Sequence, residues 1–312
     1  MNRKFTVWFA VFFVCAGIAR AAEENYLSYY EYDNKAPLKE RWAGMQGHPY
    51  YNLYKVIYTS VNDERVPGFY FEPRTGSKPF PCVIMQHGYM SSKMDSKSMG
   101  LLTLIKAGYA VFAIDAQYHG ERRVPGKDIF SPDIENDARA IVQTIIDLRR
   151  GIDLLETRKE IDSDRITYIG VSMGGILGSI FSGVDERVKA PVLVVGGGDW
   201  KTLVSQSEIG PARLLRKRIN SGRLESIDEL ASMMKHVEPL NFIGLVSPRP
   251  LLMINNKHDK IVPTDANKLL HAAAEEPKKI VWLDGIPGDP TGHIPPINEV
   301  TAQAIQWWKE KL

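Results

Sequence analysis

Residues 170–175, Gly-Val-Ser-Met-Gly-Gly, have the residue types and spacing of a nucleophilic serine site. Residues 166–169 before them are β-branched or aromatic and predict a strand, and a helix is predicted from Met173 on. A serine on such a sharp strand-to-helix turn is lifted clear of the sheet, and glycines are needed where side chains would clash. Its hydroxyl would also lie at a helix N-terminus, which favours developing negative charge. The pattern therefore predicts nucleophilic attack by Ser172.

In this context the segment resembles the nucleophile elbow of the α/β-hydrolase superfamily. The resemblance extends from about residue 53 to the C-terminus, and the overall pattern is similar to dienelactone-hydrolase-type and acetyl-xylan-esterase-type members. It implies an α/β fold and the order nucleophile, acid, histidine. Dienelactone hydrolases use cysteine where this chain has Ser172, so the resemblance favours carboxylic esters over lactones.

Two downstream loops supply an acid and a base in that order. Asp259 follows the apolar run 250–255, and His293 follows the run 280–283 after a glycine. The C-terminal ends of parallel strands form the ligand-binding edge of such a sheet, so both side chains are expected near Ser172. Asp199, after three glycines, is the reserve acid. The other candidate bases are expected to be structural: His48, His236, His258 and His271.

The resemblance also assigns an oxyanion hole. The turn His87-Gly88-Tyr89 follows the short strand predicted at residues 82–86. By the resemblance, the backbone N–H groups of Tyr89 and Met173 would bind the oxyanion that forms when an ester carbonyl is attacked.

Residues 115–122 read Asp-Ala-Gln-Tyr-His-Gly-Glu-Arg and hold several groups that bind metals elsewhere. His119, Glu121 and Arg122 are interpreted as a structural network near the site, because a full ligand cluster is absent and the adjacent arginines would repel a cation. The sequence also lacks a phosphate-binding or dinucleotide-binding glycine motif. No metal and no cofactor are expected.

Alternating strands and helices must position these residues. The alternation predicts a mostly parallel central sheet covered by helices on both faces. A hairpin is expected where residues 53–60 and 66–72 meet through Asn62-Asp63, and Ser131 is the expected N-cap of a long amphipathic helix.

The predicted catalytic domain spans residues 51–312 and follows an N-terminal arm at 22–50. About residues 199–244 interrupt the rhythm without a clear strand and are expected to form a small helical insertion. Trp200, at the start of this insertion, is expected to line the acyl pocket.

The composition excludes several classes of protein. The 312 residues include 39 Lys and Arg, 37 Asp and Glu, and 44% hydrophobic residues, which is typical of a globular protein. A net charge of +2 without a basic run gives no support to a nucleic-acid partner.

The first 21 residues have the layout of a secretory signal peptide, and cleavage is expected after Ala21. A basic start at residues 3–4 precedes the uncharged run 5–18, which is shorter than the roughly 20 residues of a spanning helix. The expected location is secreted or periplasmic, with no integral membrane segment after cleavage. The mature chain would keep one cysteine, Cys82.

Together these features predict a secreted serine hydrolase that cleaves carboxylic esters through Ser172, His293 and Asp259. Short acyl groups are expected, including acetylated sugars, because the insertion is too small for a large lipase lid. Two alternatives remain: a secreted serine peptidase of the prolyl-oligopeptidase type, and a non-catalytic binding protein with the hydrolase fold.

Overall fold

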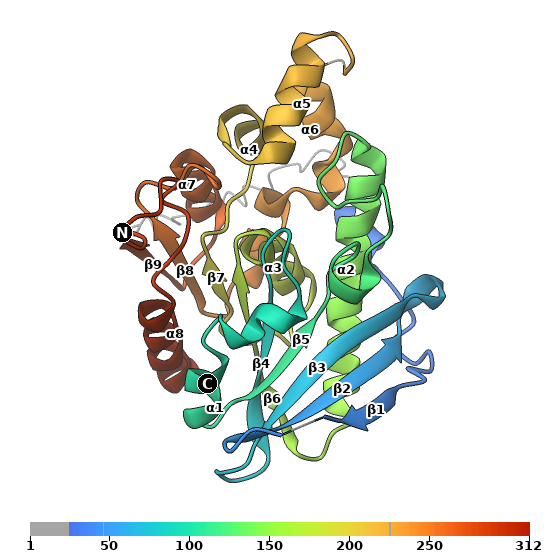
Figure 1. The fold of residues 1–312 in the computed structure, drawn as a ribbon, viewed down its shortest axis with the longest axis vertical. Helices are drawn as coiled ribbons and strands as arrows, with labels where there is room; N and C mark the ends of the chain where they lie inside the picture. Colours follow the sequence, from blue (N-terminus) through green and yellow to red (C-terminus); the bar gives the residue numbers. More distant parts are fainter. Residues whose placement is uncertain (1–24, 46, 225) are drawn as a thin grey trace, which may run out of the picture.

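One nine-stranded sheet organises the chain in the computed structural model, which describes residues 25–45, 47–224 and 226–312 (Figure 1). The strands stand in the order β1-β2-β3-β5-β4-β6-β7-β8-β9. Their bounds are β1 Arg41–Gly44, β2 Tyr51–Thr59, β3 Arg65–Pro73, β4 Phe80–Gln86, β5 Ala110–Ile114, β6 Ile161–Val171, β7 Val192–Val194, β8 Leu251–Asn256 and β9 Lys278–Leu283. The predicted signal peptide lies outside the described residues.

The sheet divides into an antiparallel edge and a parallel centre. β1, β2 and β3 pair antiparallel, and β3 joins β5 antiparallel, whereas the pairs from β5 through β4 to β9 are parallel. The predicted hairpin is confirmed, with Asn62 and Asp63 at φ of 56° and 53° in its turn. The predicted α/β class is therefore confirmed, and the parallel strands direct their C-terminal ends to one edge.

Helices cover both faces of the sheet (Figure 1). α1 and α8 contribute to the apolar core on one face, and α2, α3 and α7 contribute to the core on the other. The helix bounds are α1 Leu101–Lys106, α2 Ile134–Glu156, α3 Met173–Val184, α4 Trp200–Gln206, α5 Gly210–Asn220, α6 Ile227–Met233, α7 Thr264–Ala273 and α8 Ile297–Lys311. Within the described ranges, no helix combines the length and apolarity that crossing a membrane requires.

Two sequence predictions need correction. The N-cap of α2 is Asp133, not Ser131: its carboxylate accepts the N–H of Asn136 at 3.2 Å. Ser131 is outside the helix and donates its hydroxyl to Asp137 instead. β6 begins at Ile161, earlier than the predicted residue 166. The prediction missed this irregular extension of the sheet because residues 162–165 are polar.

The segment between β7 and β8 forms three α-helices, α4, α5 and α6, joined to β8 by short 3₁₀ turns. They gather at the upper end of the molecule in Figure 1, where α4 contacts α5 and α6, and α6 contacts α2. The arm before β2 includes β1, which pairs on the sheet edge; the sequence analysis did not identify this four-residue strand. The helices therefore project over the edge of the sheet where the parallel strands end.

Candidate active site

Ser172 occupies the turn between β6 and α3 with φ of 57° and ψ of −117°. This backbone conformation is sparsely populated for a residue with a side chain, and such strain is concentrated at functional sites. Glycines make the turn possible: a Cβ at Gly170 would lie 2.3 Å from the carbonyl oxygen of Gly174. A Cβ at Gly174 would lie 2.4 Å from the carbonyl oxygen of Gln86 on β4. The local sequence thus fixes a sharp turn that presents Ser172.

The structure brings Ser172, His293 and Asp259 into one hydrogen-bonded chain. Nε2 of His293 lies 2.9 Å from Oγ of Ser172, and Nδ1 lies 2.7 Å from Oδ2 of Asp259. The Asp259 carboxylate is completely buried, whereas the His293 side chain is 17% exposed. This is the relative placement of nucleophile, base and orienting acid that activates a serine.

Backbone hydrogen bonds aim both partners at the serine. Oδ1 of Asp259 accepts the N–H groups of Ile261 and Val262 at 2.8 and 2.9 Å, which leaves Oδ2 for His293. The side-chain amide of Asn256, the last residue of β8, donates to the backbone carbonyl oxygen of His293 at 3.0 Å. The loops after β8 and β9 are therefore tied together at the sheet edge.

The reserve acid and the other histidines have different surroundings. Asp199 caps α4 by accepting the N–H of Thr202 at 3.0 Å. The amide of Asn255 donates to Nε2 of the buried His271, and burial lowers the pKa of His271 to about 4. Three histidines lie elsewhere: His236 stacks on Tyr29, His48 stacks on Tyr51, and His258 is exposed.

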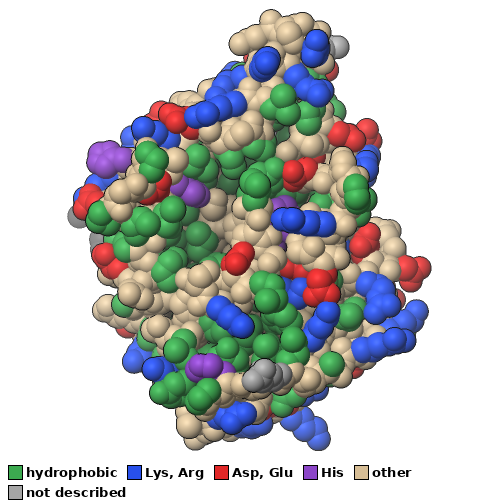
Figure 2. All heavy atoms as spheres, viewed as in Figure 1, with side chains coloured by type: hydrophobic (Ala, Val, Ile, Leu, Met, Phe, Trp, Pro, Cys, Tyr) green, Lys and Arg blue, Asp and Glu red, His purple; other side chains and the backbone are tan. Residues whose placement is uncertain are grey.

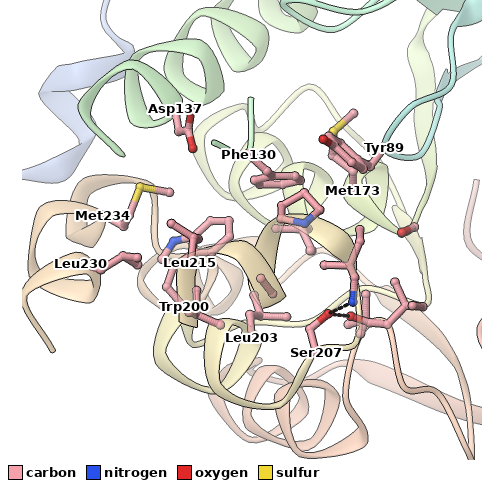
Figure 3. A pocket seen from close by; sticks show the side chains of 18 of the residues that line it. Tyr89, Phe130, Asp137, Met173, Trp200, Leu203, Ser207, Leu215, Leu230 and Met234 are labelled. Carbon is pink, nitrogen blue, oxygen red and sulfur yellow. Dashed lines mark hydrogen bonds between the residues drawn. The ribbon is translucent and has the colours of Figure 1, made fainter. Parts of the chain in front are cut away.

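The residues predicted for the oxyanion hole lie beside Ser172. Met173 is the first residue of α3, and the first N–H groups of a helix have no partner within it. The turn that holds Tyr89 passes close by, because a Cβ at Gly88 would lie 3.5 Å from Cβ of Ser172. Tyr89 and Met173 also line the same pocket as Ser172 (Figure 3).

Two neutral histidines hold this turn. Nε2 of His87 accepts the N–H of Ala116 at 3.1 Å, so its proton is on Nδ1, which donates to the carbonyl of Gly88 at 2.7 Å. Nε2 of His119 accepts the N–H of Met90 at 3.3 Å. Burial lowers the pKa of His87 to about 4 and also lowers the pKa of His119. Both rings therefore stay neutral acceptors at neutral pH.

A buried ion network lies behind the turn. The carboxylate of Asp115 accepts hydrogen bonds from the ammonium group of Lys93 at 2.5 Å and from the backbone N–H of Glu121 at 2.9 Å. The side chains of Lys93 and Asp115 are 1% and 0% exposed. Arg122 pairs with Asp147 at 2.5 Å. The contacts of Asp115 join the segments after β4 and β5, and Arg122 joins the second of these segments to α2. In the described ranges, no group of three or more His, Cys, Asp or Glu could hold a metal ion.

Ser172 lines a pocket whose wall also includes residues of the insertion helices α4, α5 and α6. Figure 3 labels Trp200, Leu215 and Leu230 among the latter. The empty space of this pocket is about 690 Å³, part of which is open to solvent. Trp200 is among the residues that line it, and its indole N–H donates to the carbonyl of Val237 at 3.0 Å. The view in Figure 2 shows hydrophobic side chains at the surface below the basic tip of the insertion.

Sequence analysis missed most of the pocket wall. The wall includes Phe130 from the loop before α2, Leu215 from α5, and Leu230 from α6. It also includes Asp137 on α2, which sits three residues after Ile134 and four before Ile141. An acidic residue on the apolar face of an amphipathic helix is a signal that could have identified Asp137.

Comparison with known proteins identifies the family of the chain. Residues 30–196, more than half of the chain, match the model of the family described as Acetyl xylan esterase (AXE1). A putative hydrolase from Bacillus subtilis, YtaP, is 25% identical over 229 residues, which cover 69% of this chain and 72% of that protein. The esterase YjfP of Escherichia coli is 25% identical over 202 residues, covering 64% and 76%.

Solved structures show the same fold. An acetyl xylan esterase from Paenibacillus sp. R4 superposes with a TM-score of 0.78 at 20% identity, covering 92% of each chain. The family match and the esterase relative agree with an α/β-hydrolase fold. The chain belongs to the acetyl xylan esterase family and is a carboxylic ester hydrolase.

Proposed function

We propose that Ser172, His293 and Asp259 form the catalytic triad of a serine esterase. The observation that carries this proposal is the continuous hydrogen-bonded chain, with 2.9 Å between Ser172 and His293 and 2.7 Å between His293 and Asp259. Alignment of a nucleophile, a base and an orienting carboxylate is the geometry required for acyl transfer.

In the first half of the reaction, Nε2 of His293 removes the proton from Oγ of Ser172 as this oxygen attacks the ester carbonyl. Asp259 holds the proton on Nδ1 and stabilises the imidazolium that forms. The imidazolium then gives the proton to the departing alcohol, leaving the acyl group on Ser172. Water, deprotonated by His293, attacks the acyl-enzyme and releases the carboxylic acid. No cofactor enters these steps.

The oxyanion of each tetrahedral intermediate is proposed to bind the N–H groups of Tyr89 and Met173. The proximity of the Gly88 turn to Ser172 supports this assignment. Fixed backbone donors at this position stabilise charge only as it develops, and each contributes typically about 10²–10³ in rate. His87 and His119 support the turn without contacting substrate.

For the substrate, we propose a carboxylic ester whose acyl group enters the pocket lined by Trp200. Short acyl groups, including acetylated sugars, remain the prediction, and the family match supports acetyl esters as the first to test. The pocket has space beyond an acetyl group, so larger acyl groups belong in the same series.

We also propose that the protein is exported, as residues 1–21 predict. Expression of the full chain and N-terminal sequencing of the mature protein would test this. A mature N-terminus at Ala22 in a periplasmic or culture fraction is the expected result. An intact Met1 in the cytoplasm would contradict it.

The test of the activity uses p-nitrophenyl esters of increasing acyl length together with an amino-acid p-nitroanilide. Hydrolysis of the esters, with little turnover of the anilide, is expected. A fluorophosphonate should label the protein, and mass spectrometry should locate the label on Ser172. Preferred cleavage of the anilide would favour the peptidase alternative, and absence of both turnover and labelling would overturn the proposed mechanism.

A further inference from the structure

The pocket beside Ser172 contains one ionisable carboxyl group in an otherwise apolar wall. Among the described residues that line it, Asp137 is the only carboxylic acid, and none is a Lys, Arg or His. Most of its neighbours there are apolar, including Phe130, Leu215 and Met234. A carboxyl group in such surroundings is unfavourable unless it is hydrogen-bonded, so its partners are informative.

Ser131 alone supplies two hydrogen bonds to this carboxyl group. The hydroxyl of Ser131 donates to Oδ1 at 2.7 Å, and its backbone N–H donates to Oδ2 at 2.5 Å. The side chain of Asn136 gives the carboxyl group a further hydrogen bond. The two carboxylate oxygens have four lone-pair sites between them, so one site stays open for a ligand. Burial raises the pKa of Asp137 to about 7, against the opposing effect of these hydrogen bonds. Both the ionised and the protonated form can therefore be present at neutral pH, and both can accept a hydrogen bond.

The other polar side chains of the pocket donate their hydrogens to protein acceptors, and none of them is a carboxyl group. The hydroxyl of Tyr89 donates to Asp128 at 2.6 Å, and the hydroxyl of Ser207 donates to the carbonyl of Ile261 at 2.6 Å. The hydroxyl of Ser172 is hydrogen-bonded to Nε2 of His293. Asp137 is thus the carboxyl acceptor available to a ligand group away from the reacting carbonyl.

Figure 3 shows where this acceptor lies. Tyr89 and Met173, which flank the reaction centre, are on one side of the view, and Asp137 is on another side, beyond Phe130. The intervening wall is apolar. A ligand that reaches from Ser172 to Asp137 must therefore combine an ester carbonyl, an apolar body and a polar group at its far end.

We propose that Asp137 is a specificity-determining residue that selects esters of hydroxylated acids, whose apolar acyl body fills the pocket and whose distal hydroxyl donates to Asp137. This inference rests on the proposed serine esterase mechanism and names the substrate class of the same site. The acyl part is assigned to the pocket because it stays bonded to Ser172 while the alcohol leaves for solvent.

A hydroxyl fits this site better than an ammonium. An ammonium group has three N–H donors, and the carboxyl group of Asp137, which already accepts hydrogen bonds from Ser131 and Asn136, offers it one open acceptor site. A hydroxyl needs one acceptor, and its burial without one is unfavourable. The same reasoning predicts that removal of Asp137 reverses the preference, because the hydroxyl would then be buried unpaired.

The experiment compares two matched pairs of p-nitrophenyl esters: 6-hydroxyhexanoate with hexanoate, and 3-(4-hydroxyphenyl)propanoate with 3-phenylpropanoate. The wild-type enzyme is expected to favour the hydroxylated member of at least one pair by about tenfold in kcat/KM. Asp137→Leu should bring that ratio to one or below, and Asp137→Asn, which keeps an acceptor oxygen, should give an intermediate ratio.

Glu135→Gln is the matched control, because Glu135 is an exposed carboxylate on the same helical turn and pairs with Arg139. It should keep the wild-type ratio. If Asp137 only holds the Ser131 turn, its variants would slow both members of a pair equally and leave the ratio unchanged. That outcome, or a wild-type ratio of one in both pairs, would overturn the proposal.

A binding measurement separates this proposal from the catalytic one. Ser172→Ala should bind methyl 3-(4-hydroxyphenyl)propanoate more tightly than methyl 3-phenylpropanoate by calorimetry, and the double variant with Asp137→Leu should lose the difference. If wild type hydrolyses no ester and takes no fluorophosphonate, the mechanism fails while these affinities still test the subsite. Equal affinities, with normal ester turnover, would reject the subsite alone.

Discussion

The two sides of Ser172 differ in polarity. Behind the turn that holds Tyr89, the structure places buried polar groups, with neutral His87 and His119 on the backbone and Lys93 paired to Asp115. In the pocket, apolar side chains from α2 and the insertion form the wall, and Asp137 supplies the one carboxyl group among the described lining residues.

The contrast has a physical basis. Backbone donors that stabilise an oxyanion must be held in place before reaction, and hydrogen bonds in a buried environment do this with defined direction. An acyl group has no charge to recognise, so it is selected by shape and by removal of apolar surface from water. We therefore expect substitutions behind the turn to change kcat, and substitutions in the pocket to change which esters react.

Ser172 lies between the polar turn and the apolar pocket, and its substitution should have the largest effect on activity. Ser172→Ala is expected to lower kcat about 10⁴-fold or more for every ester, because no acyl-enzyme can form. Steady-state kinetics with p-nitrophenyl acetate would measure it. Ser205→Ala, an exposed serine on α4, is the control and should retain activity. Residual activity within tenfold of wild type in Ser172→Ala would show that another nucleophile operates.

Filling the pocket should affect only larger substrates. Ala212 lines the wall from α5 and is 6% exposed. Ala212→Phe is expected to lower kcat/KM for the hexanoate ester about 10²-fold, because four methylenes at about 0.8 kcal/mol each lose their burial. The acetate ester should change little. Leu214→Phe, at an exposed position of the same helix, is the control. An equal loss for both esters would break the assignment of this pocket to chain length.

The polar side should be sensitive to acid. The folded-state pKa of His87 is about 4, below its unfolded value near 6.5, so the unfolded chain binds more protons between these values. Stability must then fall as pH falls, by about 2 kcal/mol from His87 between pH 7 and pH 5. His87→Gln should remove this part of the decline in urea unfolding measured at both pH values. An unchanged pH dependence in the variant would contradict the buried neutral state.

The smallest effect is expected at the second histidine of the turn. His119→Phe removes the acceptor for the N–H of Met90. The turn should then hold the N–H of Tyr89, the proposed oxyanion donor, less firmly. We therefore expect kcat to fall about tenfold with KM nearly unchanged. His48→Phe, in a surface stack on Tyr51, is the control. A change in KM alone would place His119 among the groups that bind substrate instead.

Much of the fold followed from local patterns. The apolar runs gave the central strands, and the turn at Asn62 and Asp63 gave the hairpin, because strand and turn preferences act over a few residues. The N-cap of α2 was missed because Ser131 and Asp133 are both suitable capping types. Ser131 does not cap the helix in the structure, and its hydroxyl donates to Asp137 instead.

The pocket was far less predictable. Its wall combines residues of α2 with residues of the three insertion helices α4, α5 and α6. These segments are far apart in the sequence, so their contacts depend on how the helices pack and not on a local pattern. Trp200 was expected there, whereas Phe130, Leu215 and Leu230 were not. Nothing local distinguishes an apolar side chain that lines a pocket from one that fills a core.

The sequence by itself determined the serine turn, because the strain at Ser172 and the space beside Gly170 and Gly174 involve neighbouring residues and the nearest strand. It also determined the class of sheet, through the alternation of strands and helices. Only the tertiary structure decided that Asp259 faces His293 while Asp199 caps a helix, and that His293 meets a serine 121 residues away. It also decided that Asp137 enters the pocket. These relations depend on the distance between loops, which is set by the packing of the whole sheet.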